Sequence, residues 1–112
     1  MRKRIEDWLE LLRDVNVVAR CTAARALGQM GPQAREAIPA LIQALQDREP
    51  LVRDAVADAI GCIDPQAPDA VMALRQALAD TNSFVQTTAA KALKKIEVSQ
   101  AFPGNPTRFD PF

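Results

Sequence analysis

The chain contains no histidine and no tyrosine among its 112 residues. Without histidine it cannot form a Ser–His or Cys–His nucleophilic system or a histidine-ligated metal site. Asp54 and Asp58 are four residues apart and form a carboxylate pair on one helix face. They have no partner base or third ligand, which favours a solvated edge over a catalytic pair. We therefore expect no enzyme activity, no catalytic or metal site, and no cofactor.

The chain also lacks an excess of charge of either sign, because 14 Lys and Arg balance 14 Asp and Glu. A neutral chain has no overall attraction to nucleic acid or to anionic membranes. No apolar run approaches the roughly 20 residues of a membrane span. The basic residues that follow Met1 are followed at once by acidic ones, so no apolar core of a signal peptide develops. These absences predict a cytoplasmic protein that binds neither nucleic acid nor membrane.

The main feature that is present is a 33-residue repeat, found three times without a gap. The shift by one repeat superposes apolar residues in register, for example Leu27 and Ile60 in the first two copies. Self-similarity at such a period is typical of stacked-repeat proteins, in which each unit buries its apolar face against its neighbours. Aromatic residues make up only 4% of the chain and alanine is abundant, which suits closely packed helices.

Each unit contains two apolar patterns of helical period. The first patterns span residues 4–13, 36–46 and 69–79, and the second span 16–30, 49–63 and 82–97. Asn16 and Asn82 are suitable N-caps of second helices, and Gly31-Pro32 predicts a turn between units. We expect six helices in three antiparallel pairs. They form one domain over residues 1–97, with repeats at about 4–31, 36–64 and 69–97.

Charged residues recur in register with the apolar ones. Asp14, Asp47 and Asp80 occupy the inter-helix turns, and Arg20 and Arg53 follow the first two of them by six residues. A turn aspartate can accept backbone N–H groups of the next helix start, and the arginine can reach the aspartate of the neighbouring unit. These five residues predict a structural ladder between units. The third copy has glutamine in place of the arginine.

The second unit carries a family resemblance. Residues 37–53 read AIPALIQALQDREPLVR, and residues 57–61 read ADAIG. With a proline in the first helix, an aspartate in the turn and Val-Arg opening the second helix, the segment resembles a HEAT repeat of the HEAT-like class named after phycobilisome lyase subunits. The resemblance covers residues 4–97. It implies an all-α fold, a right-handed α-solenoid of three HEAT-like helix pairs, followed by a Pro/Phe-rich C-terminal tail.

The resemblance also implies a non-enzymatic protein–protein interaction scaffold, in which the second helices line the concave face and bind a partner peptide or helix. Its subclass implies an alternative, a bilin lyase-like or pigment-protein chaperone subunit. A helical wheel gives the positions opposite the buried stripe of each second helix. The candidate binding residues on the concave face are Cys21, Arg25, Gln29, Asp54, Asp58, Cys62, Thr87, Lys91 and Lys95.

The central row of this set, Arg25, Asp58 and Lys91, alternates in charge. In one interpretation these charges pair weakly with one another on a solvated surface. In the other they recognise a mixed-charge peptide or helix. A nucleic-acid site would need a uniformly basic row, and Asp54 and Asp58 argue against it.

The two cysteines are predicted to be reduced thiols. Cys62 lies eight residues, about 12 Å of helix rise, beyond the counterpart of Cys21 in the second unit, which is too far for a disulfide. We expect both to be small packing or surface residues. A reactive or bilin-carrying role is the alternative.

The tail, residues 98–112, contains three prolines and a glycine, so we expect it to be non-helical. Phe102, Phe109 and Phe112 are costly to leave in water, by roughly 1.5–3 kcal/mol each when burial is available. They are candidate binding residues in two ways. Either they dock on the array or on a second copy, giving a homodimer through the tail or the array ends, or they form a linear motif for another protein. Trp8 is expected in the core, with an anchor at the open end as the alternative.

Overall fold

A computed structural model of the chain describes residues 4–64 and 67–101. Within these two ranges the chain contains helices and connecting turns but no strand. The tail candidates Phe102, Phe109 and Phe112 lie outside the described residues. The elements are α1 (Ile5–Leu11), α2 (Val17–Met30), the 3₁₀ helix η1 (Gly31–Ala37), α3 (Ile38–Ala44), α4 (Pro50–Ile63), α5 (Pro68–Ala77) and α6 (Ser83–Ala101).

The expectation of six separate helices is wrong at the first junction between units. Gly31 ends α2 with a φ of 64°, a left-handed value that glycine adopts readily. Pro32 then supplies a φ suited to a helix start, and η1 leads directly into α3. The predicted turn at Gly31-Pro32 is therefore a 3₁₀ helix. The described chain has five separate helical segments, namely α1, the continuous run 17–44, α4, α5 and α6.

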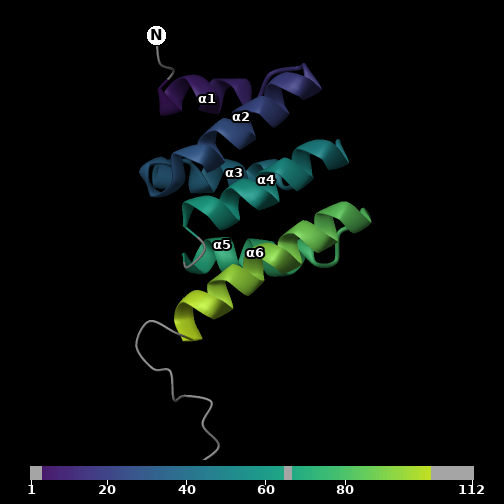
Figure 1. Ribbon diagram of the computed structural model, residues 1–112. Coiled ribbons are helices and arrows are strands. Elements are labelled where there is room, and N and C mark those ends of the chain that lie inside the picture. The colour runs from purple at the N-terminus through teal and green to yellow at the C-terminus, as the bar shows by residue number, and fades with distance from the viewer. Residues whose placement is uncertain (1–3, 65–66, 102–112) are drawn as a thin grey trace, which may run out of the picture.

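The helices form two layers (Figure 1). The second helices α2, α4 and α6 lie side by side in one layer, and the first helices α1, α3 and α5 lie in the other. Each first helix packs against the second helix of its own unit, and each second helix packs against the next second helix. This arrangement buries one contiguous apolar core between the layers. Core residues recur at the 33-residue period, as Leu27 and Ile60 or Leu41 and Leu74 do.

Glycine brings the second helices close together. A Cβ added to Gly28 of α2 would lie 3.0 Å from Ala59 Cα of α4, and one added to Gly61 of α4 would lie 2.7 Å from Ala92 Cβ of α6. Both distances are shorter than an ordinary carbon–carbon contact of about 3.5–4.0 Å. The absence of a side chain at these two positions, which are one repeat apart, thus sets the spacing between adjacent units.

Asparagine caps fix where two of the second helices begin. Asn16 Oδ1 accepts the Val18 N–H at 2.7 Å, and Asn82 Oδ1 accepts the Phe84 N–H at 2.8 Å. The last second helix is longer than predicted, because α6 continues to Ala101 where a non-helical tail was expected from residue 98. Residues 98–101 contain no helix breaker, and the first proline after them is at position 103.

Trp8 is half-buried and packs against the core from α1. Its neighbours Ile5, Leu9 and Leu11 are also only partly covered, because α1 belongs to the first unit and packs on the core from one side. The prediction of a core tryptophan is therefore met in part, since the residue contacts the core without being fully enclosed.

Candidate functional site

The exposed side of α2, α4 and α6 is the surface on which most of the predicted binding residues lie. We call it the second-helix face. Equivalent positions, one repeat apart, form rows that cross the three helices. The predicted residues that are exposed on this face are Arg25, Gln29, Asp58, Cys62, Thr87, Lys91 and Lys95.

The charged row consists of Arg25 on α2, Asp58 on α4 and Lys91 on α6, and all three side chains are exposed. Among the described residues, no salt bridge within 4.0 Å involves any of them. The row therefore presents three charges, positive, negative and positive, to solvent. The sequence alone leaves open whether these charges pair with one another, and the geometry shows no such ion pair in the described part of the chain.

Two predicted residues lie deeper than the helical wheel indicated. Cys21 is only 8% exposed, and burial raises the pKa of its thiol. Asp54 is half-buried and accepts a hydrogen bond from the Thr88 hydroxyl of α6. A wheel describes one helix in isolation, whereas the next second helix covers this edge. Asp54 therefore belongs to the contact between α4 and α6.

Three of the remaining predicted residues make contacts on the second helices. The Thr87 hydroxyl donates to the Ser83 carbonyl of its own helix at 2.9 Å, which engages its donor. Lys95 Nζ lies 4.0 Å from Cys62 Sγ, so these two residues, one repeat apart, contact each other across α4 and α6. Both cysteines are free thiols, Cys62 exposed and Cys21 buried.

An apolar row on the same face is absent from the residues that the sequence predicted. Val18, Leu51 and Phe84 are 71%, 66% and 73% exposed, and they occupy equivalent positions in the first turns of α2, α4 and α6. The signal is present in the sequence, since the 33-residue shift superposes three apolar residues that lie outside the buried stripe. A helical wheel that selects polar positions passes over this row.

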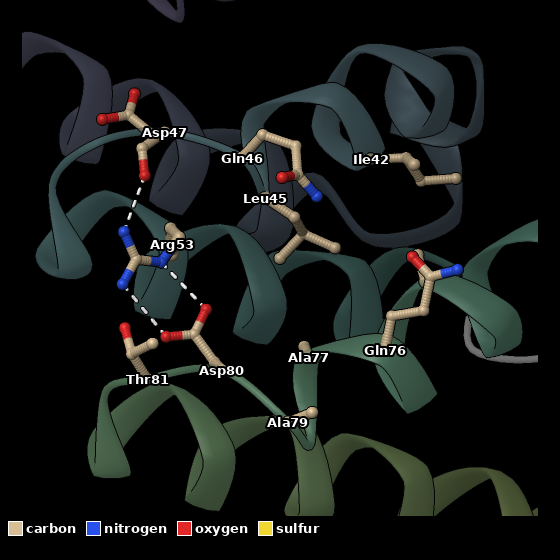
Figure 2. Close-up of a pocket in the computed structure, with 11 residues that line it drawn as sticks. Ile42, Leu45, Gln46, Asp47, Arg53, Gln76, Ala77, Ala79, Asp80 and Thr81 are labelled. Atoms are coloured by element: carbon tan, nitrogen blue, oxygen red, sulfur yellow. Dashed lines mark hydrogen bonds and ion pairs between the residues drawn. The ribbon is translucent and has the colours of Figure 1, made fainter.

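The ladder residues form ion pairs between units. Arg20 Nε donates to Asp47 Oδ2 at 2.8 Å and its Nη2 donates to Asp47 Oδ1 at 3.1 Å. Arg53 makes the same bidentate contact with Asp80, at 2.9 and 3.0 Å. Each arginine also donates from Nη1 to the turn aspartate carbonyl of its own unit, as Figure 2 shows for Arg53 and Asp47. Each ladder arginine therefore connects the turn of its own unit to the turn of the next.

The aspartates complete the turns. Asp14, Asp47 and Asp80 each accept, through Oδ1, the N–H of the residue two positions on, at 2.8–2.9 Å. Burial alone would raise the pKa of Asp80, but the hydrogen bonds from Arg53 and from the Asn82 N–H outweigh it and lower the pKa. The ladder charges are thus engaged in contacts within the fold, whereas the charges of the row face solvent.

Clefts lie on the opposite side, between the first helices. One, of about 350 Å³, has Leu45 and Ala77 among its lining residues, with the Arg53–Asp80 pair at one end (Figure 2). A second, of about 430 Å³, is lined by Leu12 and Ala44, which are their equivalents one unit earlier. Because the same cleft recurs at both junctions between units, it follows from the stacking of the repeat.

Within residues 4–64 and 67–101, no group of three or more Cys, Asp or Glu side chains is placed to hold a metal ion. In the same ranges, no helix combines the length and the apolar character that crossing a membrane requires.

Comparison with known proteins supports the repeat architecture. A scan against protein families matches residues 5–94 to HEAT repeats. A search of curated proteins finds no match. The matched segment contains α1 to α5, the first twelve residues of α6, the Asp–Arg ladder and all the predicted residues of the second-helix face except Lys95. The chain therefore belongs to the HEAT-repeat family.

Proposed function

We propose that this protein is a non-enzymatic protein–protein interaction scaffold that binds a partner peptide or helix on its second-helix face. HEAT repeats commonly mediate protein–protein interaction, which supports the class of function. The observation that carries the proposal is the charged row. Arg25, Asp58 and Lys91 are exposed, and none of them forms a salt bridge with another described residue.

The contrast with the ladder supports the same assignment. Four of the ladder residues, Arg20, Asp47, Arg53 and Asp80, form bidentate pairs that hold the units together, and their side chains are only 12–13% exposed. The charges of the row contribute no such contact within the described chain. Side chains that are exposed, arranged in register and not needed for packing are suited to recognition.

The packing supports the assignment of this face as concave. Second helices approach closely through Gly28 and Gly61, while clefts remain between the first helices. A stack that is tighter in one layer than in the other curves toward the tighter layer, and such concave surfaces are the ones that solenoid repeats use for binding. The right-handed sense of the solenoid and a cytoplasmic location stay predictions.

Affinity capture from cells of the source organism tests the proposal. The bait is the full chain, compared with a variant carrying Arg25→Ala, Asp58→Ala and Lys91→Ala. The matched control removes three exposed charges of the same signs, one from each unit, elsewhere on the molecule. It carries Arg13→Ala, Glu36→Ala and Arg75→Ala.

The expected result is a partner that the wild type and the control retain and the row variant loses. Circular dichroism should show equal folding of all three, because surface substitutions of this kind change stability by about 0.5 kcal/mol or less. Loss of the partner from the control alone would contradict the proposal. The alternative, a bilin lyase-like or pigment-protein chaperone subunit, rests on the repeat subclass alone. It predicts visible tetrapyrrole absorbance after co-expression with pigment and acceptor protein.

A further inference from the structure

Two exposed rows run parallel across the second-helix face, one apolar and one charged. Val18, Leu51 and Phe84 form the first, and the charged row lies seven residues further along each helix. Seven residues are two turns, so both rows point in nearly the same direction from the helices and lie about 10 Å apart. The residues between them, four positions after the apolar row, are small: Thr22, Ala55 and Thr88.

The spacing along each row is set by the packing of the helices. Adjacent packed helices lie about 8–10 Å apart. Within a single α-helix, residues seven apart recur on one face and are separated by about 10.5 Å. An α-helix laid across α2, α4 and α6 therefore meets each row with one residue every two turns. A helix with its side chains is about 10–12 Å wide, which matches the separation of the two rows.

We propose that the second-helix face binds an amphipathic α-helix of another protein, with apolar residues at i, i+7 and i+14 and an adjacent stripe that reads acidic, basic, acidic. The apolar residues contact Val18, Leu51 and Phe84, and the charged stripe faces Arg25, Asp58 and Lys91. The inference rests on the proposed function and adds the chemistry of the partner. The small residues between the rows let the helix approach the surface closely.

The charge order argues against a second copy of this chain as the occupant. The row reads the same from either end: positive, negative, positive. A face-to-face dimer that brings the two charged rows together in register places Asp58 opposite Asp58 in either orientation. It also places positive ends opposite positive ends, and opposed like charges suppress association. The palindromic row therefore repels itself and favours a partner of the complementary order.

The test uses two Ala-rich helical peptides of six turns, about 21 residues long at 3.6 residues per turn. Each has leucine at i, i+7 and i+14. The patterned peptide carries Glu, Lys, Glu on the adjacent stripe, and the permuted peptide carries Glu, Glu, Lys. The two peptides have the same amino-acid composition and the same net charge. Dissociation constants for the full chain are measured by fluorescence anisotropy at about 50 mM salt, where exposed charges are less screened.

The patterned peptide should bind about tenfold more tightly, because the permuted one forms one opposite-charge pair and two like-charge pairs with the row. Substitution of Phe84→Ala should weaken binding of the patterned peptide about tenfold, because it removes the one aromatic anchor of the apolar row. Met72→Ala, at a similarly exposed residue of α5, should leave it unchanged. A charge-swap variant tests for a gained peptide preference. Asp58→Lys makes the row uniformly basic and should shift the preference to a peptide with three glutamates.

Equal binding of the two peptides, or no preference shift with Asp58→Lys, overturns the inference. So does salt-sensitive retention of the chain on anionic vesicles that Asp58→Lys strengthens, because it assigns the face to a membrane surface. A dimer in light scattering that Phe84→Ala abolishes assigns the row to a second copy and overturns it as well. The proposed function is decided separately. One outcome is a captured partner that is lost with the charged-row variant but binds normally to the Phe84→Ala chain. This result supports the proposed scaffold function and refutes the proposal that the partner is an amphipathic helix.

Discussion

Replacing Arg53 by glutamine isolates one ion pair of the ladder. The third unit already has glutamine at this position, and Gln86 Nε2 donates to the Asp80 carbonyl just as Arg53 Nη1 donates to the Asp47 carbonyl. In Arg53→Gln the backbone hydrogen bond can therefore persist while the bidentate contact with Asp80 is lost. The substitution tests how much the inter-unit pair contributes to stability.

The expected loss lies between two limits. Exposed ion pairs contribute about 0.2–1 kcal/mol, and removing one partner of a buried pair costs about 3–5 kcal/mol. The Arg53 and Asp80 side chains are 13% and 12% exposed, and Asp80 keeps its hydrogen bond from the Asn82 N–H. We expect a loss of about 1.5 kcal/mol in the free energy of unfolding, or about 6–12 °C in the melting temperature.

Urea and thermal unfolding, followed by circular dichroism at pH 7, measure the effect. A double-mutant cycle with Asp80→Asn, which retains an oxygen for the Asn82 N–H, gives the coupling energy between the two side chains. We expect at least about 1 kcal/mol. If the stability losses of the two single variants simply add, the contact between Arg53 and Asp80 contributes nothing to stability. The proposed role of the ladder pair is then wrong.

Three further outcomes follow from the packing and from the two perturbed groups. Gly61→Ala should lower the free energy of unfolding by about 1 kcal/mol, because a contact of 2.7 Å with Ala92 outweighs the gain of about 1 kcal/mol in helix propensity; a more stable variant in urea unfolding would contradict the close helix contact. The lowered pKa of Asp80 stabilises the fold above the pKa of an unfolded aspartate, about 3.9, and this contribution is lost as the pH falls through the lower folded value. Acid unfolding should therefore be less pH-dependent below about pH 4 in Asp80→Asn than in the wild type. Exposed Cys62 should react with a thiol-specific reagent much faster than buried Cys21, whose pKa is raised, and equal rates in the two single Cys→Ser variants would refute the burial.

The stacked fold could be predicted from the sequence because the 33-residue period is a property of the packing itself. Each apolar position, such as Leu27 or Ile60, recurs wherever a unit meets its neighbour. The spacing of aspartate and arginine likewise pointed to pairs between units, and such pairs join Arg20 to Asp47 and Arg53 to Asp80.

The junction after α2 could not be predicted in the same way. Gly31-Pro32 is a strong turn signal, yet both residues are also compatible with 3₁₀ geometry once Gly31 has ended the α-helix. The sequence therefore predicts that α2 ends at Gly31, but not that the connection to α3 is a 3₁₀ helix, because that depends on where α3 must pack.

The face was predicted in part, for a related reason. The exposed row of Arg25, Asp58 and Lys91 follows from the helical wheel alone. The depth of Cys21 and Asp54 depends on the next helix, which the wheel does not include.

The most direct test of the account is a map of where a partner helix contacts the chain. Amide chemical shifts of the ¹⁵N-labelled protein are recorded as the patterned peptide is added. The largest changes should fall on the exposed residues of α2, α4 and α6, with Leu51 and Asp58 at the centre. Changes that instead concentrate around the clefts between the first helices, near Leu45 and Ala77, would contradict this prediction.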